Sequence, residues 1–197
     1  QFHCYMRDLI LMLAANINQK TNEEMIMHSS LSNSCIPAAQ AMLHNLSHIL
    51  TKGEEAATAR KFDASILINA RLAPDMFPLS RQVQISCDGV KNGLARIAGI
   101  EPPKFEDTET TFSQLHERIR KTLDFVKTIP ADKIDGHEDR DITFPAGKDK
   151  TRTLKGHAYV HNWMMPNLYF HITTTYAILR NNGVDVGKLD YLMGEKR

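Results

Sequence analysis

The chain has 197 residues, of which 42% are hydrophobic and 24% are charged, and its formal net charge is +1. This length and composition fit a single globular domain with a buried core. The nearly neutral charge argues against a nucleic-acid partner, which needs a strongly basic face. The three cysteines are widely spaced and form no Cys-x-x-Cys pair, so we expect reduced thiols in a cytoplasmic protein.

Residues 1–26 are predicted to be an N-terminal extension, and residues 27–197 a helical domain. The apolar run from Leu9 to Ala15 has the length of the apolar region in a secretory signal. Arg7 is followed at once by Asp8, however, and a short amphipathic helix is the preferred interpretation. No apolar stretch of the sequence reaches the roughly 18 residues of a membrane span, and we therefore expect no membrane partner.

The first long helix is predicted from Cys35 to Leu50, because apolar residues recur there every three or four positions. Ser34 is its expected N-cap, and Gly53 is expected to end it. A short helix follows across residues 64–71. Pro74 then interrupts the pattern, since proline lacks the backbone N–H that a helix interior requires.

Residues 78–98 form the second predicted long helix, which Gly99 should cap at its C-terminus. The Glu-Pro-Pro run at residues 101–103 cannot continue a helix and predicts a stiff connection. Thr111 and Gln114 form a capping box for the third long helix. The apolar stripe of that helix consists of Phe112, Leu115, Ile119, Leu123 and Val126.

The pattern changes to that of a small β-hairpin between residues 141 and 154, where two short strand-like segments flank a turn that contains proline and glycine. The last long helix is predicted from residue 157 to residue 182, with Pro166 inside it and Gly183 as its cap. Four long helices and one hairpin predict an all-α, antiparallel four-helix bundle.

Three segments of the sequence carry a resemblance to a known family: residues 68–85, 167–171 and 177–184. The last of them contains the pattern Leu-Arg-x-x-Gly at residues 179–183. On these segments the chain resembles, from about residue 27 to residue 192, a family of uncharacterised helical-bundle proteins related to the DinB-like bundles. The resemblance implies a DinB-like four-helix bundle with a small β-hairpin before the last helix.

Many DinB-like bundles bind a metal ion through three histidines, two of which lie four residues apart on the last helix. Counting back from Leu-Arg-x-x-Gly, these two positions correspond to Asn167 and His171 in this chain. The third ligand would come from the second long helix near residues 82–84, where no histidine occurs. An amide oxygen binds zinc or nickel far more weakly than an imidazole does, so we expect no metal and no cofactor.

Two further histidine pairs have the four-residue spacing of metal ligands on a helix. His44 and His48 lie opposite the apolar stripe of the first long helix and are expected to face solvent. His157 and His161 begin the last helix, where His161 is expected to border the inner face. Because each pair supplies only two ligands, packing or solvent exposure is the preferred interpretation.

The candidate site combines polar residues at and after the Pro74 bend with polar residues on the inward face of the last helix. His171 falls within the inward stripe of the last helix, where its imidazole needs a hydrogen-bond partner. Arg71 and Asp75 flank Pro74 and form either a salt bridge that fixes the bend or an anion-binding pair. With Gln84 and Asn167, these residues are predicted to line one cavity between the helices.

Three functions remain open at this stage. The preferred one is a bundle that binds a small organic molecule between its helices without a metal. The alternatives are an enzyme that uses His171 as a general acid or base or in a weak metal site, and a structural or regulatory bundle that mainly dimerises. Tyr169 and Phe170 should point away from the inward stripe, which predicts a homodimer or, alternatively, cover by the N-terminal extension.

Overall fold

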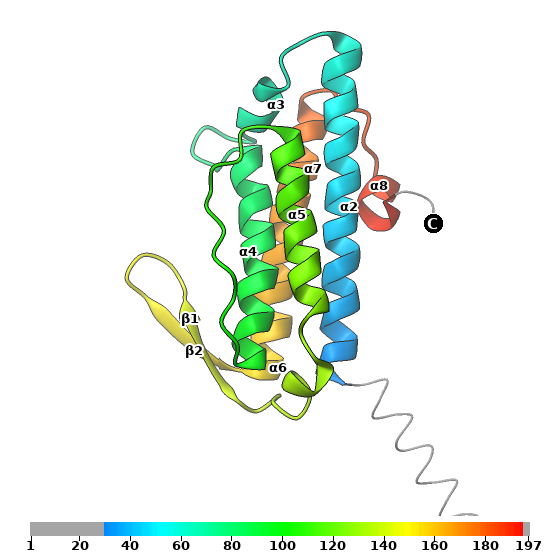
Figure 1. Cartoon of the computed structure of the whole chain (residues 1–197). Coiled ribbons are helices and arrows are strands. Elements are labelled where there is room, and N and C mark those ends of the chain that lie inside the picture. The colour runs from blue at the N-terminus through cyan, green and yellow to red at the C-terminus, as the bar shows by residue number, and fades with distance from the viewer. Residues whose placement is uncertain (1–29, 195–197) are drawn as a thin grey trace, which may run out of the picture.

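The computed structural model describes residues 30–194, so the predicted extension of residues 1–26 lies outside the described residues. Within that range four long helices lie side by side (Figure 1): α2 (Leu31–Arg60), α4 (Leu79–Ala98), α5 (Phe112–Lys127) and α7 (Met165–Asn181). None of the helices within residues 30–194 is long and apolar enough to cross a membrane.

Helix α2 is longer than the sequence pattern predicted. Its N-cap is Ser30, whose hydroxyl accepts a hydrogen bond from the backbone N–H of Asn33 at 3.3 Å. Gly53 lies inside the helix and is buried, so the expected helix end at Gly53 was wrong. A Cβ atom at Gly53 would lie 3.0 Å from Leu179 Cδ2. The glycine therefore allows α2 and α7 to pack closely.

The short helix α3 (Ser65–Asn69) links α2 to α4, and Gly99 ends α4 in the left-handed conformation at φ 67°, as predicted. Residues 99–111 then run back along the whole bundle (Figure 1), so α5 runs parallel to α4 rather than antiparallel. Residues 99–111 are long enough to return along the full length of α4. About 13 extended residues span roughly 40 Å, whereas the 20 residues of α4 span about 30 Å. The predicted capping box of Thr111 and Gln114 starts α5.

A two-stranded antiparallel hairpin precedes the last long helix, as predicted. Strand β1 (Asp141–Pro145) pairs with β2 (Thr151–Lys155), and the 3-10 turn η1 (Ala131–Lys133) joins α5 to this region. The chain continues through α6 (Gly156–Tyr159) and the π-helical turn η2 (Val160–Met164) into α7. Pro166 explains the π turn, because proline has no backbone N–H to close the preceding α-helical turn.

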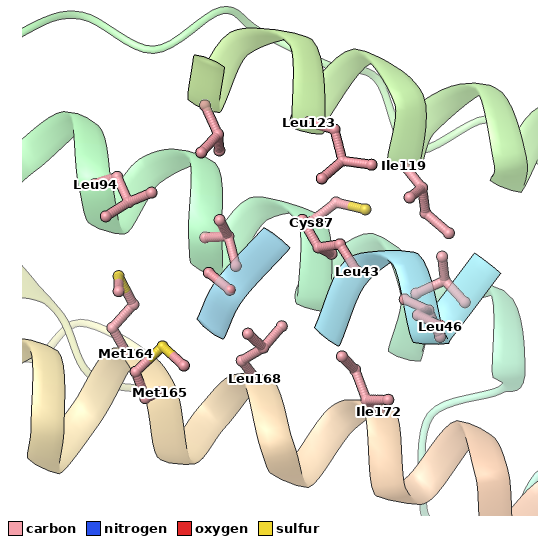
Figure 2. Close-up of a cluster of buried hydrophobic side chains, with 14 of the residues drawn as sticks. Leu43, Leu46, Cys87, Leu94, Ile119, Leu123, Met164, Met165, Leu168 and Ile172 are labelled. Atoms are coloured by element: carbon pink, nitrogen blue, oxygen red, sulfur yellow. The ribbon is translucent and has the colours of Figure 1, made fainter. Parts of the chain in front are cut away.

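The core lies along the axis of the bundle, where apolar side chains from all four long helices meet (Figure 2). Leu43 and Leu46 come from α2, Cys87 from α4, and Met165 and Leu168 from α7, and all five are buried. Burial raises the pKa of the Cys87 thiol to about 12. Cys87 is therefore a protonated core residue.

A further short helix, α8 (Lys188–Met193), packs against α2. Its Asp190 accepts a hydrogen bond from His48 at 2.9 Å, so His48 is tied to α8 rather than fully solvated as predicted. On α7, Tyr169 and Phe170 are 41% and 56% exposed and point outward as expected. The homodimer inferred from these two aromatic residues stays a prediction.

Candidate functional site

His171 finds its hydrogen-bond partner on the neighbouring helix α4. Its Nδ1 atom is 2.7 Å from Oε1 of Gln82, which is buried. The amide nitrogen of Gln82 donates to the carbonyl of Phe77 at 3.0 Å. Oε1 must therefore face the imidazole as an acceptor, and Nδ1 of His171 must carry the proton. The half-buried histidine is satisfied within the bundle, as buried polar groups usually are.

Replacing His171 with glutamine should reduce the loss of stability on acidification. Burial lowers the pKa of His171 in the folded protein, and the charge of Arg81 lowers it further, whereas the unfolded chain has the usual pKa of about 6.5. As the pH is lowered, the unfolded state therefore binds the proton before the folded state does. The free energy of unfolding decreases as the pH decreases through this range. Urea unfolding at pH 7.5 and pH 5.5 measures this decrease in the free energy of unfolding. An equal decrease in His171→Gln and in the wild type would contradict the lowered pKa of His171 in the folded protein.

The other predicted site residues do not gather around His171. Gln84 lies on the opposite side of α4 from Gln82 and donates to Glu109 at 2.9 Å. This follows from helix geometry, because two residues turn the helix by about 200°. Arg71 and Asp75 are exposed; Arg71 donates to the carbonyl of Met76, and no ion pair within residues 30–194 joins it to Asp75. The single cavity predicted from these residues is therefore not formed.

Gln84 belongs instead to a charged network centred on Arg118 of α5. The side chain of Arg118 is fully buried and lies 2.9 Å from each of three carboxylates, those of Asp88, Asp107 and Glu109. This network was not predicted from the sequence, although Arg118 falls on the apolar stripe of its helix, next to Ile119. A charged residue at such a position is a signal that carboxylates elsewhere in the chain must reach it.

Lys91 extends this network to the connection between α4 and α5. Its ammonium group donates to the carbonyl of Pro103 at 2.8 Å, contacts Asp88 at 3.1 Å and lies 4.2 Å from the ring centroid of Phe105. The network therefore fixes the path of residues 99–111 along the bundle. We interpret its function as structural.

A cavity of about 500 Å³ lies between α4, the hairpin turn, η2 and the start of α7, and we call it the α4–α7 cavity. Of the residues predicted from the sequence, Asn167 lines it. Its lining includes Asp88, Gly89, Asn92, Arg96, Tyr159, Trp163 and Asn167.

Glycines on α4 shape this cavity. A Cβ atom at Gly89 would have no heavy atom within 4 Å, so the missing side chain leaves open space. One turn later, a Cβ atom at Gly93 would lie 2.5 Å from Met164 Sδ, so this glycine lets η2 approach α4. The sequence thus places an opening and a close contact on the same helix.

Aromatic rings form the wall opposite α4. The ring centroid of Phe144, on β1, lies 4.8 Å from that of Tyr159 and 4.8 Å from that of Trp163. The Asn167 side chain donates to the carbonyl of Trp163 at 2.7 Å and so caps the π turn. The hairpin, η2 and α7 therefore hold Trp163 in place together.

Arg96 and Tyr159 meet at the cavity. The guanidinium of Arg96 donates to the Tyr159 hydroxyl oxygen at 3.3 Å. Within the part of the chain that the structure describes, Arg96 forms no ion pair with a carboxylate. Neither residue was predicted from the sequence, because neither lies in a recognisable motif and they are 63 positions apart.

Comparison with known proteins identifies the family. The sequence model of a domain of unknown function, DUF1993, matches residues 31–192. The chain belongs to the DUF1993 family. It is also similar to a protein of known crystal structure, a DinB family member protein from Shewanella denitrificans, with 40% identity and a TM-score of 0.77 over 85% of this chain and 94% of that chain. The predicted relation to DinB-like bundles is thereby confirmed, and no curated protein matches the chain significantly.

The histidines within residues 30–194 form no cluster of potential metal ligands. Among the described residues, no group of three or more His, Cys, Asp and Glu side chains is arranged to hold a metal ion. The ring centroids of His157 and His161 lie 4.4 Å apart, and both residues are exposed. The expectation that His161 borders the inner face was therefore wrong. The absence of a bound metal stays a prediction.

A larger and more open cavity of about 820 Å³ lies between α2, residues 104–109 and α5. Within it, the Ser47 hydroxyl and Nδ1 of His116 are 2.9 Å apart. Arg120 and Lys121, which also line it, pair with Glu117. Arg120 and Lys121 thus pair with a carboxylate, whereas Arg96 in the α4–α7 cavity of this DUF1993 protein pairs with none among the described residues.

Proposed function

We propose that this DUF1993 protein binds a small organic molecule in the α4–α7 cavity, without a metal. The observation that carries the proposal is a cavity of about 500 Å³ in which aromatic rings face an arginine that has no carboxylate partner among the described residues. Ligand sites usually have volumes of roughly 300–1,000 Å³ and combine apolar walls with a few polar groups.

The lining residues supply both kinds of contact. Tyr159 and Trp163 offer apolar ring surface, while Asn92 and Asn167 offer amide groups that can orient a ligand. Three packed elements, α4, the hairpin and η2, surround the cavity, so it exists before a ligand arrives. Such preorganisation reduces the entropy that binding costs.

A screen of small organic fragments by thermal unfolding tests this proposal. A fragment present at 100 times its Kd should stabilise the wild type by about 2.7 kcal/mol. Gly89→Leu should abolish the stabilisation, because its side chain enters the open space at this position and fills the cavity. The wild-type response should persist in EDTA if no metal takes part.

The matched control is Gly89→Ala, which adds only a Cβ atom and should keep most of the response. Fragments that stabilise wild type and Gly89→Leu equally would contradict binding in this cavity. A screen in which no fragment stabilises the wild type would contradict small-molecule binding itself.

A further inference from the structure

We infer that the ligand of the α4–α7 cavity carries a carboxylate, which Arg96 binds together with the hydroxyl of Tyr159. This inference rests on the proposed function and names the class of molecule that the cavity takes. It is carried by hydrogen-bond donors of these two side chains that have no acceptor among the described residues.

The guanidinium of Arg96 has N–H groups with no acceptor among the described residues. An arginine guanidinium has five N–H groups in a planar fork that matches a carboxylate. Within the described residues, one of them donates to the Tyr159 oxygen at 3.3 Å, and none reaches a carboxylate. Arg81, which also lines the cavity, is different, because it pairs with Asp107 and donates to Gln84. Arg96 is thus the cation of this cavity that is available to a ligand.

Tyr159 supplies a second donor. The residue is only 2% exposed, and its hydroxyl oxygen accepts the hydrogen bond from Arg96. Among the described residues, no acceptor is found for the hydroxyl hydrogen itself. Buried hydroxyl groups normally use their donor. A carboxylate held in the fork of Arg96 would accept this hydrogen bond as well.

The charges around the cavity favour a monoanion over a phosphate ester with two charges. Asp88 lines the same cavity about 12 Å along α4 from Arg96, but Arg118 and Lys91 already bind it, so it adds no cation or free donor for a ligand. Arg81 lies about 22 Å from Arg96 along the helix and is already neutralised by Asp107. One available guanidinium and one hydroxyl therefore match one carboxylate.

The rest of the ligand should be planar and largely apolar. Trp163 and Tyr159 both line the cavity, and the ring of Phe144 supports them at 4.8 Å from each. Aromatic rings of a ligand pack favourably against such side chains. Asn92 lies four residues before Arg96 on the same face of α4 and can bind a polar substituent.

The chain itself provides the reporter for a test, because Trp163 is its single tryptophan. Titration of the full-length protein with benzoate should change the tryptophan fluorescence in a saturable manner. Benzamide, which has the same shape without the charge, should bind more weakly. Arg96→Gln should weaken benzoate binding roughly 10- to 100-fold, the range expected for a charge-assisted hydrogen bond, and leave benzamide binding unchanged.

Three more variants make the test specific. Arg96→Lys keeps the charge without the fork and should recover part of the affinity. Tyr159→Phe removes the second donor and should weaken benzoate binding severalfold. Arg180→Gln removes an exposed arginine from the last turn of α7 and should bind benzoate like the wild type. Circular dichroism melts of each variant show that it is folded.

Benzamide binding as tightly as benzoate would overturn the carboxylate inference while leaving small-molecule binding intact. Tighter binding of phenyl phosphate than of benzoate would overturn it as well, as would unchanged benzoate affinity in Arg96→Gln. If benzoate produces no fluorescence change, the inference fails, and the fragment screen with Gly89→Leu decides separately on the proposed function.

Discussion

Arg118→Met should lower the free energy of unfolding by on the order of 3 kcal/mol. The guanidinium of Arg118 is fully buried and lies 2.9 Å from each of three carboxylates, those of Asp88, Asp107 and Glu109. Without it, these carboxylates face one another and residues 99–111 lose their main anchor on α5. Urea unfolding at neutral pH measures the change.

Arg120→Met is the matched control on the same helix. Arg120 is 61% exposed and pairs with Glu117 and Asp124 on the surface of α5. Exposed ion pairs contribute less than about 1 kcal/mol, so this variant should remain close to the wild type. If Arg118→Met and Arg120→Met lower the free energy of unfolding equally, the buried network of Arg118 does not contribute more to stability than an exposed ion pair.

Gly93→Ala should destabilise the protein by about 2 kcal/mol. The added Cβ atom would lie 2.5 Å from Sδ and 2.8 Å from Cγ of Met164, which is buried against the core and has little room to move. Helix α4 and the π turn η2 would have to separate. The temperature of thermal unfolding reports the effect.

Gly89→Ala is the control one turn earlier on α4. Its Cβ atom would meet nothing within 4 Å, and alanine favours the helix over glycine by up to about 1 kcal/mol. This variant should therefore unfold at a higher temperature than the wild type. If both substitutions shift the unfolding temperature in the same direction, the packing described for η2 against α4 is incorrect.

Local signals in the sequence were sufficient for most of the fold. The helix end at Gly99 and the capping box of Thr111 and Gln114 depend on a few neighbouring residues, and each was predicted correctly. Gly53 misled the prediction because a glycine that ends a helix and a glycine that allows close packing look alike in a sequence. Periodicity also carries no information on direction, so the parallel course of α4 and α5 could not be predicted.

The candidate site was predicted less well, because its residues meet only through tertiary packing. Asn167 was identified from its place on the last helix, and it lines the cavity. Three lining residues were not predicted, because no sequence motif marks them: Arg96 on α4, Tyr159 on α6 and Trp163 on η2. The hairpin orients the segment that carries Tyr159 and Trp163. The inward position of His171 was predicted, whereas its partner Gln82 could not be distinguished from Gln84 without the exact rotation of α4.

A crystal structure of the protein with the tightest fragment from the screen tests the central claim, ligand binding in the α4–α7 cavity, most directly. We expect electron density for the fragment between Trp163 and Arg96, with the cavity walls in the positions described above. An empty cavity, with the same fragment bound elsewhere on the bundle, would contradict the proposed function.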